Sequence, residues 1–81
     1  MNWLEVSMDL QADLAEPAVE LLGRLAPNGV AVEMLDASVR VRAWLPYDSA
    51  LPDRRRQLDE GLWHLSQIQP LPIPEFRLVE E

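Results

Sequence analysis

The sequence predicts an α+β fold in which two helices cover one face of a four-stranded antiparallel sheet. Apolar and polar residues alternate in four stretches, apolar residues recur at helical spacing in two others, and glycine or proline separates most of these stretches. The resulting order is strand, helix, strand, strand, helix, strand. A chain of 81 residues can bury one modest core, so we expect a single domain over residues 1–81.

The first half of the chain contains a strand and a helix. Residues 3–10 alternate strictly, as in a strand with one buried face. Apolar residues then recur every three or four positions over residues 14–25, which indicates an amphipathic helix. Asp13 and Glu16 resemble a capping box, which would place Pro17 in the first turn, where proline is tolerated.

The second half contains a hairpin and another helix. Residues 30–35 and 38–45 both alternate, and only Asp36 and Ala37 separate them, so they predict a hairpin with a very short connection. The connection lacks the glycine that such turns prefer. A second amphipathic helix should begin near Pro52 and end at about residue 66.

The last segment completes the fold. Prolines at every second position from 70 to 74 favour an extended segment, and FRLVEE then resumes alternation as a short strand. This order of elements is that of the ferredoxin-like βαββαβ sandwich. Its sheet has the strand order 4-1-3-2, with both helices on one face and the other face open.

The open face should carry two arginines from the stretch SVRVRAWLP. Keeping the aliphatic side chains under the helices leaves few registers between the first and third strands. The register that we predict pairs Glu5 with Arg42 and Ser7 with Arg40, and the hairpin sets Glu33 beside Arg40. These pairs would make a charge-matched surface, or a surface that grips a partner.

Three tryptophans are candidates for contacts with a partner. The predicted register also pairs Trp3 with Trp44, making an apolar spot at one end of the open face, unless the two rings pack under the termini. Trp63 projects about 100° from the apolar stripe of the second helix. Either the proline-rich segment covers it or it docks onto another domain.

The charge of −7 limits the classes of partner. An acidic chain repels nucleic acid and anionic lipid, whereas a basic protein would be attracted. The absence of cysteine suits a reducing compartment, and no apolar run approaches the ~20 residues that cross a bilayer. We therefore expect a cytoplasmic protein that binds neither membrane nor nucleic acid.

No pattern in the sequence predicts catalysis, a metal or a cofactor. The one histidine, His64, has no nucleophile near it in any recognisable motif and should lie on the surface. The run Arg54 to Arg56 should form intrahelical ion pairs with Asp59 and Glu60, one turn on. The three glycines are isolated, so they form no nucleotide loop.

Four strings resemble one family in their order and spacing: NWLEVSMDL, AEPAVELLGRLAPNGVAVE, VRAWLP and PEFRLVEE. They are similar to the N-terminal domain of PrmA, the methyltransferase of large-subunit ribosomal protein eleven. The resemblance implies a domain that recognises the basic ribosomal protein substrate. It also implies a separate catalytic domain that uses S-adenosylmethionine to methylate lysine side chains and the terminal amine, and this chain lacks the motifs of that domain.

Two hypotheses follow. In the first, the chain is a non-catalytic, monomeric recognition domain, with acidic and aromatic side chains as the contacts. In the second, it is a stand-alone module that dimerises through its open face, with or without a small ligand. The candidate contact residues are Trp3, Glu5, Asp9, Glu33, Trp44, Asp59 and Trp63.

Overall fold

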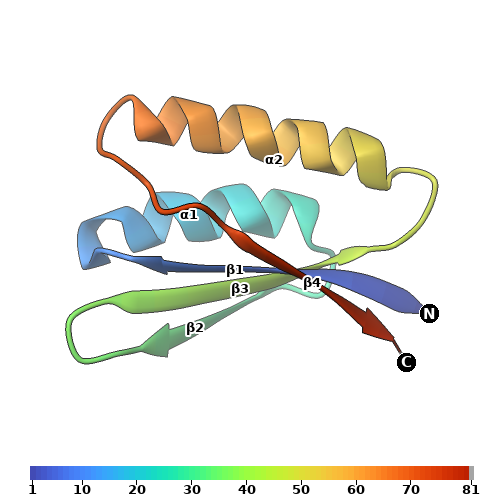
Figure 1. Cartoon of the computed structure of the whole chain (residues 1–81), viewed down its shortest axis with the longest axis horizontal. Helices are drawn as coiled ribbons and strands as arrows, with labels where there is room; N and C mark the ends of the chain where they lie inside the picture. The colour runs from blue at the N-terminus through green and yellow to red at the C-terminus, as the bar shows by residue number, and fades with distance from the viewer. Residues whose placement is uncertain (81) are drawn as a thin grey trace.

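A computed structural model describes residues 1–80 of the chain. Four strands and two helices follow one another in the predicted order (Figure 1). They are β1 (Asn2–Leu10), α1 (Ala12–Leu25), β2 (Val30–Met34), β3 (Val39–Pro46), α2 (Leu51–Ser66) and β4 (Glu75–Glu80).

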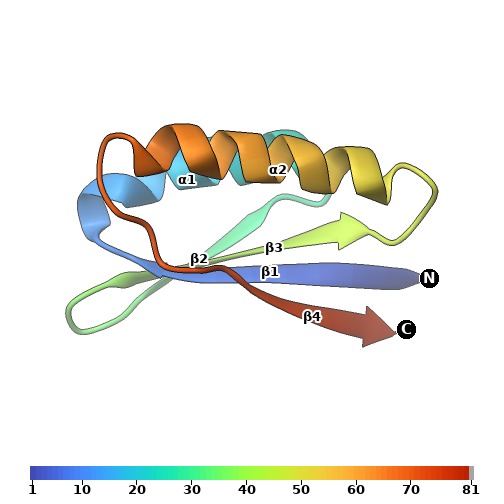
Figure 2. The ribbon, with the colours of Figure 1, turned by 45° about the horizontal axis from the view of Figure 1, so that its top comes forward.

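The four strands form one antiparallel sheet in the order β2-β3-β1-β4, which is the predicted order counted from the other edge. Both helices lie over one face of this sheet, and the other face is free of helices (Figure 2). The α+β sandwich that the sequence predicts is therefore confirmed. Its two termini lie at the same end of the sheet, where Asn2 of β1 pairs with Glu80 of β4.

The predicted register between β1 and β3 is wrong by two residues. Glu5 lies opposite Trp44, and Ser7 lies opposite Arg42. A shift of two keeps every side chain on its predicted face, because successive residues of a strand alternate between faces. The alternation of apolar residues therefore could not distinguish the two registers.

The hairpin between β2 and β3 agrees with the sequence. Asp36 and Ala37 form its tip, and the Leu35 amide donates to the Ser38 carbonyl oxygen at 2.9 Å below it. Glu33 lies opposite Arg40, as predicted.

The start of α1 differs from the prediction. Gln11 is its N-cap and makes no side-chain capping bond, so Asp13 and Glu16 do not form a capping box. Because the helix begins at Ala12, Pro17 is its sixth residue rather than part of its first turn. A proline there has no amide to donate to the carbonyl of Asp13, which lowers the intrinsic stability of this helix.

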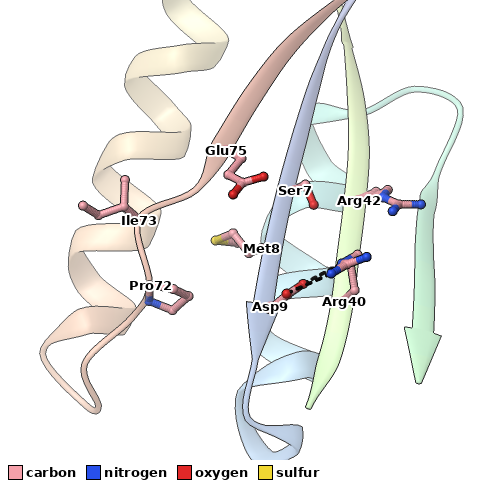
Figure 3. A pocket seen from close by; sticks show the side chains of 8 residues that line it. All are labelled: Ser7, Met8, Asp9, Arg40, Arg42, Pro72, Ile73 and Glu75. Carbon is pink, nitrogen blue, oxygen red and sulfur yellow. Dashed lines mark hydrogen bonds and ion pairs between the residues drawn. The ribbon is translucent and has the colours of Figure 1, made fainter. Parts of the chain in front are cut away.

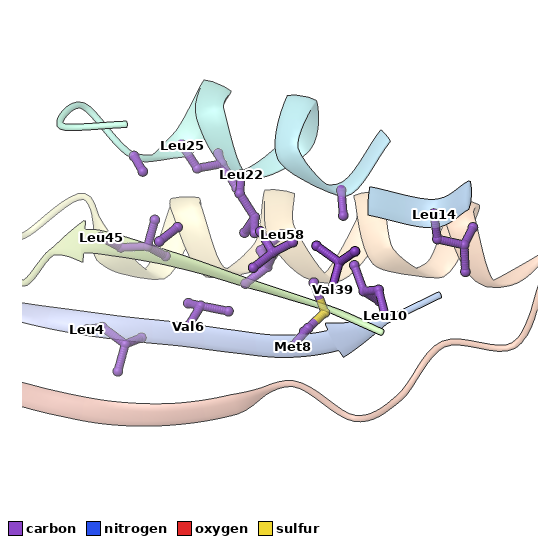
Figure 4. Packing of buried hydrophobic residues seen from close by; sticks show 14 residues of the cluster. Leu4, Val6, Met8, Leu10, Leu14, Leu22, Leu25, Val39, Leu45 and Leu58 are labelled. Atoms are coloured by element: carbon purple, nitrogen blue, oxygen red, sulfur yellow. The ribbon is translucent and has the colours of Figure 1, made fainter. Parts of the chain in front are cut away.

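The core lies between β1, β3 and the two helices (Figure 4). Helix α1 contributes four buried residues, whereas α2 contributes one, Leu58, which is fully buried. At the edge of the sheet, Val32 and Met34 of β2 remain 52% and 75% exposed. The buried side chains are Leu4, Val6, Met8, Leu10, Leu14, Ala18, Leu22, Leu25, Ala26, Val39, Val41, Ala43, Leu45 and Leu58.

Candidate protein-binding surfaces

The open sheet face is a network of ion pairs. Arg40 of β3 donates from Nε and Nη2 to the two carboxylate oxygens of Asp9 on β1, at 2.7 and 3.1 Å. This bond and the positive charge hold the pKa of Asp9 below its ordinary value, and the same contact raises the pKa of Arg40. The pair is bidentate, a geometry that fixes both side chains more firmly than a single bond would.

Glu5 occupies the centre of this face. Its side chain is 11% exposed, and the register places it between β3 and β4. Nε of Arg77 on β4 donates to its Oε2 at 2.8 Å, and Nη2 of the same guanidinium lies 2.7 Å from that oxygen, while Nε of Arg42 lies 3.8 Å from Oε1. The buried carboxylate is thus compensated from both neighbouring strands, as a buried charge requires.

Beside Glu5 the open face is hollowed over Ser7, whose short side chain lies among longer ones (Figure 3). The hollow measures about 360 Å³, and a neighbouring one of about 440 Å³ continues it toward Arg77. Both are open, and all the charged groups that line them except Glu75 make an ion pair on this face. The first is lined by Ser7, Met8, Asp9, Arg40, Arg42, Pro72, Ile73 and Glu75.

Two tryptophans lie at the other end of the open face, as predicted, although they are not opposite each other. Trp3 pairs with Pro46, two positions beyond the predicted Trp44, so the two tryptophans are diagonal neighbours on the sheet. Both rings are partly buried, and with Asn28 and Val79 they line a hollow of about 370 Å³. The indole nitrogen of Trp3 is buried and has no hydrogen-bond partner among residues 1–80.

The open face carries little net charge. Its side chains include four carboxylates, on residues 5, 9, 33 and 75, against three guanidinium groups, on residues 40, 42 and 77. Its formal charge is therefore −1, whereas the whole chain has −7. This small net charge agrees with the charge-matched surface that the sequence predicts, and most of the excess negative charge of the chain lies elsewhere.

Trp63 is exposed on α2. Its relative exposure is 60%, so the proline-rich segment does not cover it. The ring contacts His64 edge-on, with 5.2 Å between centroids, and shares a hollow of about 290 Å³ with Asp59, Glu60 and His64. His64 lies on the surface, as predicted.

The arginines of α2 pair in the direction opposite to the one predicted. Arg54 bonds to Asp48 at 2.7 Å in the loop before the helix, which lowers the pKa of that carboxyl, and Arg56 bonds to Asp53 at 3.0 Å. Arg55 lies 4.0 Å above the ring of Phe76 on β4. Consequently Asp59 and Glu60 have no ion pair among residues 1–80.

A groove runs between the two helices and meets the surface around Trp63. It measures about 250 Å³ and is lined by Pro17, Glu20, Leu21 and Arg24 of α1, with Gly61, His64 and Leu65 of α2. The helices are antiparallel, since Gln69 after α2 donates to Asp13 at the start of α1 at 3.0 Å. The second half of α2 therefore lies beside the first half of α1.

The structure thus divides the predicted contact residues between two surfaces. Asp59 and Trp63 lie together on α2, and the other five lie on the opposite side of the sheet or at its edge strand. Sequence reasoning missed the carboxylates in the first half of α1, on Asp13, Glu16 and Glu20, of which Glu20 lines the groove beside His64. The antiparallel packing of the two helices could have suggested them, because it brings the start of α1 to the end of α2.

Neither a glycine at the first strand-to-helix turn nor a cluster of metal-ligating side chains occurs among residues 1–80. The turn from β1 into α1, residues 10–12, contains no glycine, whereas the corresponding turn of dinucleotide-binding α/β folds is glycine-rich. Residues 1–80 contain no group of three or more metal-ligating side chains. Within the same residues no helix is long and apolar enough to span a membrane.

The whole chain is similar to two curated proteins named ribosomal protein L11 methyltransferase. It is 32% identical to the one from Chloroflexus aurantiacus and 28% identical to the one from Herpetosiphon aurantiacus, each over 96 positions that cover 99% and 100% of this chain. The chain spans 29% and 30% of the length of those proteins. No family model matches the chain, and no solved structure matches it.

Proposed function

We propose that this chain is the substrate-recognition domain of a ribosomal protein methyltransferase of the PrmA family. Its role is to bind a basic ribosomal protein of the L11 kind, and it does no chemistry itself. The observation that carries the proposal is the similarity of the entire chain to two L11 methyltransferases of which it spans less than a third. That third has no glycine-rich turn that could hold the methyl donor.

The electrostatics agree with this role. A ribosomal protein that binds RNA carries basic side chains toward the phosphates, and a partner with a charge of −7 attracts such a protein from a distance. Complementary charge raises the rate of encounter and excludes acidic partners. The chain is therefore suited to a soluble, basic protein and unsuited to RNA itself.

A separate recognition domain would raise the rate of the methylation reaction by holding the substrate near the catalytic site. When it holds the substrate protein, the lysine to be methylated stays at a high effective concentration near the catalytic part of the parent enzyme. S-adenosylmethionine would supply the methyl group there. In this scheme the residues of the present chain only bind and orient the substrate.

Isothermal titration calorimetry tests this function. The purified chain is titrated with L11 at 50 and 200 mM salt, and with an equally basic protein from outside the ribosome as the control. We expect saturable 1:1 binding of L11 that weakens with salt, and weaker binding of the control. Absence of L11 binding at 50 mM salt would contradict the proposal.

The alternative, dimerisation through the open face, has less support. A second copy on this face would cover the pairs that Glu5 and Asp9 make with the arginines, and desolvating charges is costly. We therefore expect the chain to be a monomer in the cytoplasm. Sedimentation equilibrium checks this, and a mass near twice 9.2 kDa would favour the alternative.

A further inference from the structure

We infer that the basic partner docks on one end of the helical layer, around Trp63, and that an arginine or lysine side chain of the partner lies against this indole. The inference rests on the proposed function and deepens it by naming the surface. We call this surface the acidic helical end. It consists of Asp13, Glu16 and Glu20 of α1 with Asp59, Glu60, Trp63 and His64 of α2.

The distribution of charge along the helices carries the first step. Residues 12–20 of α1 and 57–66 of α2 contain five carboxylates and no arginine. Arg54, Arg55 and Arg56 lie in the first half of α2, at the other end of the layer, because the helices are antiparallel. Arg24 of α1 lines the groove between the helices and pairs with Glu20 at 3.2 Å, so Glu20 is already compensated. A basic partner is therefore attracted to one end of the layer and repelled from the other.

The open face offers no comparable attraction. Its formal charge is −1, and each of its three arginines has a carboxylate within 4 Å. A basic partner there would have to compete with Arg40, Arg42 and Arg77 for Asp9 and Glu5, and these three arginines would repel a partner that approached Glu33 or Glu75. On α2, Asp59 and Glu60 also have no ion pair among residues 1–80, and residues 57–66 around them contain no arginine.

The side chains around Trp63 fit a cationic group chemically. Asp59 and Glu60 precede Trp63 by four and three positions, and these spacings place side chains on one helical face. A guanidinium or ammonium group can stack on an indole and bond to a carboxylate at its edge. Trp63 is 60% exposed and no segment of the described chain covers it.

The adjoining groove extends the contact beyond one side chain. Gly61 brings α2 close to Leu21 of α1, and the resulting depression of about 250 Å³ shares His64 with the hollow at Trp63. Apolar groups from Pro17 and Leu65 line it. A basic partner segment with an apolar residue near its cation could therefore fill both depressions.

The test compares variants that remove the same charge at two places. D59N/E60Q removes two carboxylates from the acidic helical end, and E33Q/D36N removes two exposed ones from β2 and its hairpin. We expect D59N/E60Q to weaken L11 binding at 50 mM salt at least fivefold and E33Q/D36N less than twofold. W63A should also weaken binding at least fivefold, whereas M34A, another exposed apolar truncation, should not.

The outcomes separate this inference from the proposed function. If both double variants lose the same amount of affinity for L11, only the total charge matters for binding. That result would overturn the inference, while the proposed function would stand. Normal binding by W63A together with strong loss in W44A would assign docking to the open face and overturn it as well. If the wild-type chain does not bind L11, the function and the docking surface are both wrong. A wild-type dimer that W63A converts to a monomer would assign the surface to a second copy instead.

Discussion

Gly61 and Leu21 are in such close contact that the two helices can approach only because residue 61 has no side chain. A β-carbon at Gly61 would lie 2.4 Å from Cδ1 and 3.1 Å from Cγ of Leu21. Rotation about the Cβ–Cγ bond of Leu21 would move Cδ1 away but would leave Cγ at the same distance. The relationship sets the spacing of the helical layer and the shape of the groove on its surface.

The change G61A should therefore destabilise the protein, although alanine is the better helix former. Alanine gains about 1 kcal/mol of helix propensity over glycine, and overpacking costs roughly 1–3 kcal/mol. We expect a net loss of about 1 kcal/mol in the free energy of unfolding, measured by urea denaturation. In an L21A background the same change should stabilise the protein, and destabilisation there would contradict the assigned contact.

Leu58 should be the most sensitive position of α2. It is the only residue of this helix that is fully buried, so truncation leaves a cavity under the helix. We expect L58A to lower the free energy of unfolding by about 2–5 kcal/mol. L78A is the matched control, because Leu78 is 47% exposed, and it should cost less than about 1 kcal/mol. Similar losses for both would mean that α2 does not cover the core in this way.

The Glu5 carboxylate should stabilise the open face. The E5Q variant keeps the shape but leaves Arg42 and Arg77 without their charged partner. The side chains of Arg42 and Arg77 are 37% and 74% exposed, so water can solvate the guanidinium groups in place of the lost carboxylate. We expect a decrease of about 1 kcal/mol in the free energy of unfolding. L11 binding by E5Q should equal that of the wild type, and a large loss of binding would contradict the assignment of docking to the helices.

Stability should fall in acid through Asp9 and Asp48. Arginines hold the pKa of both carboxyls lower in the folded state than in the unfolded chain. Such a group contributes its full stability above the unfolded pKa, roughly pH 4, and loses it as the pH falls through the lower folded value. We expect D9N and D48N to be less stable than the wild type at pH 6, with the differences shrinking toward pH 2. Thermal unfolding across this range checks the trend, and a constant difference would contradict it.

The sequence predicted much of the fold because local patterns determine it. Alternation in β1 and β3 identified which side chains lie beneath the helices, and the proline at position 52 located the start of α2. The register of β1 against β3 could not be predicted, since a shift of two residues leaves every face unchanged. The start of α1 was wrong because Asp13 and Glu16 have the spacing of a capping box, whereas the helix already begins at Ala12.

The candidate surface was harder to predict than the fold. Net charge predicts a basic partner, and spacing correctly placed Trp63 outside the core. Which carboxylates remain unpaired depends on which acidic side chain each arginine contacts, and sequence spacing does not determine this. Arg56 bonds to Asp53 rather than to Glu60, although both lie within one turn. The small net charge of the open face likewise depends on the pairing of β4 with β1, which places Arg77 beside Glu5.

The most direct measurement is an NMR titration of the isotopically labelled chain with unlabelled L11. It reports binding and locates it on the surface at once. We predict that the indole resonance of Trp63 and the amides of residues 13–20 and 59–64 shift most, and that added salt reverses the shifts. Shifts centred on Arg42 and Trp44, or no shifts at any ratio of L11, would contradict the account.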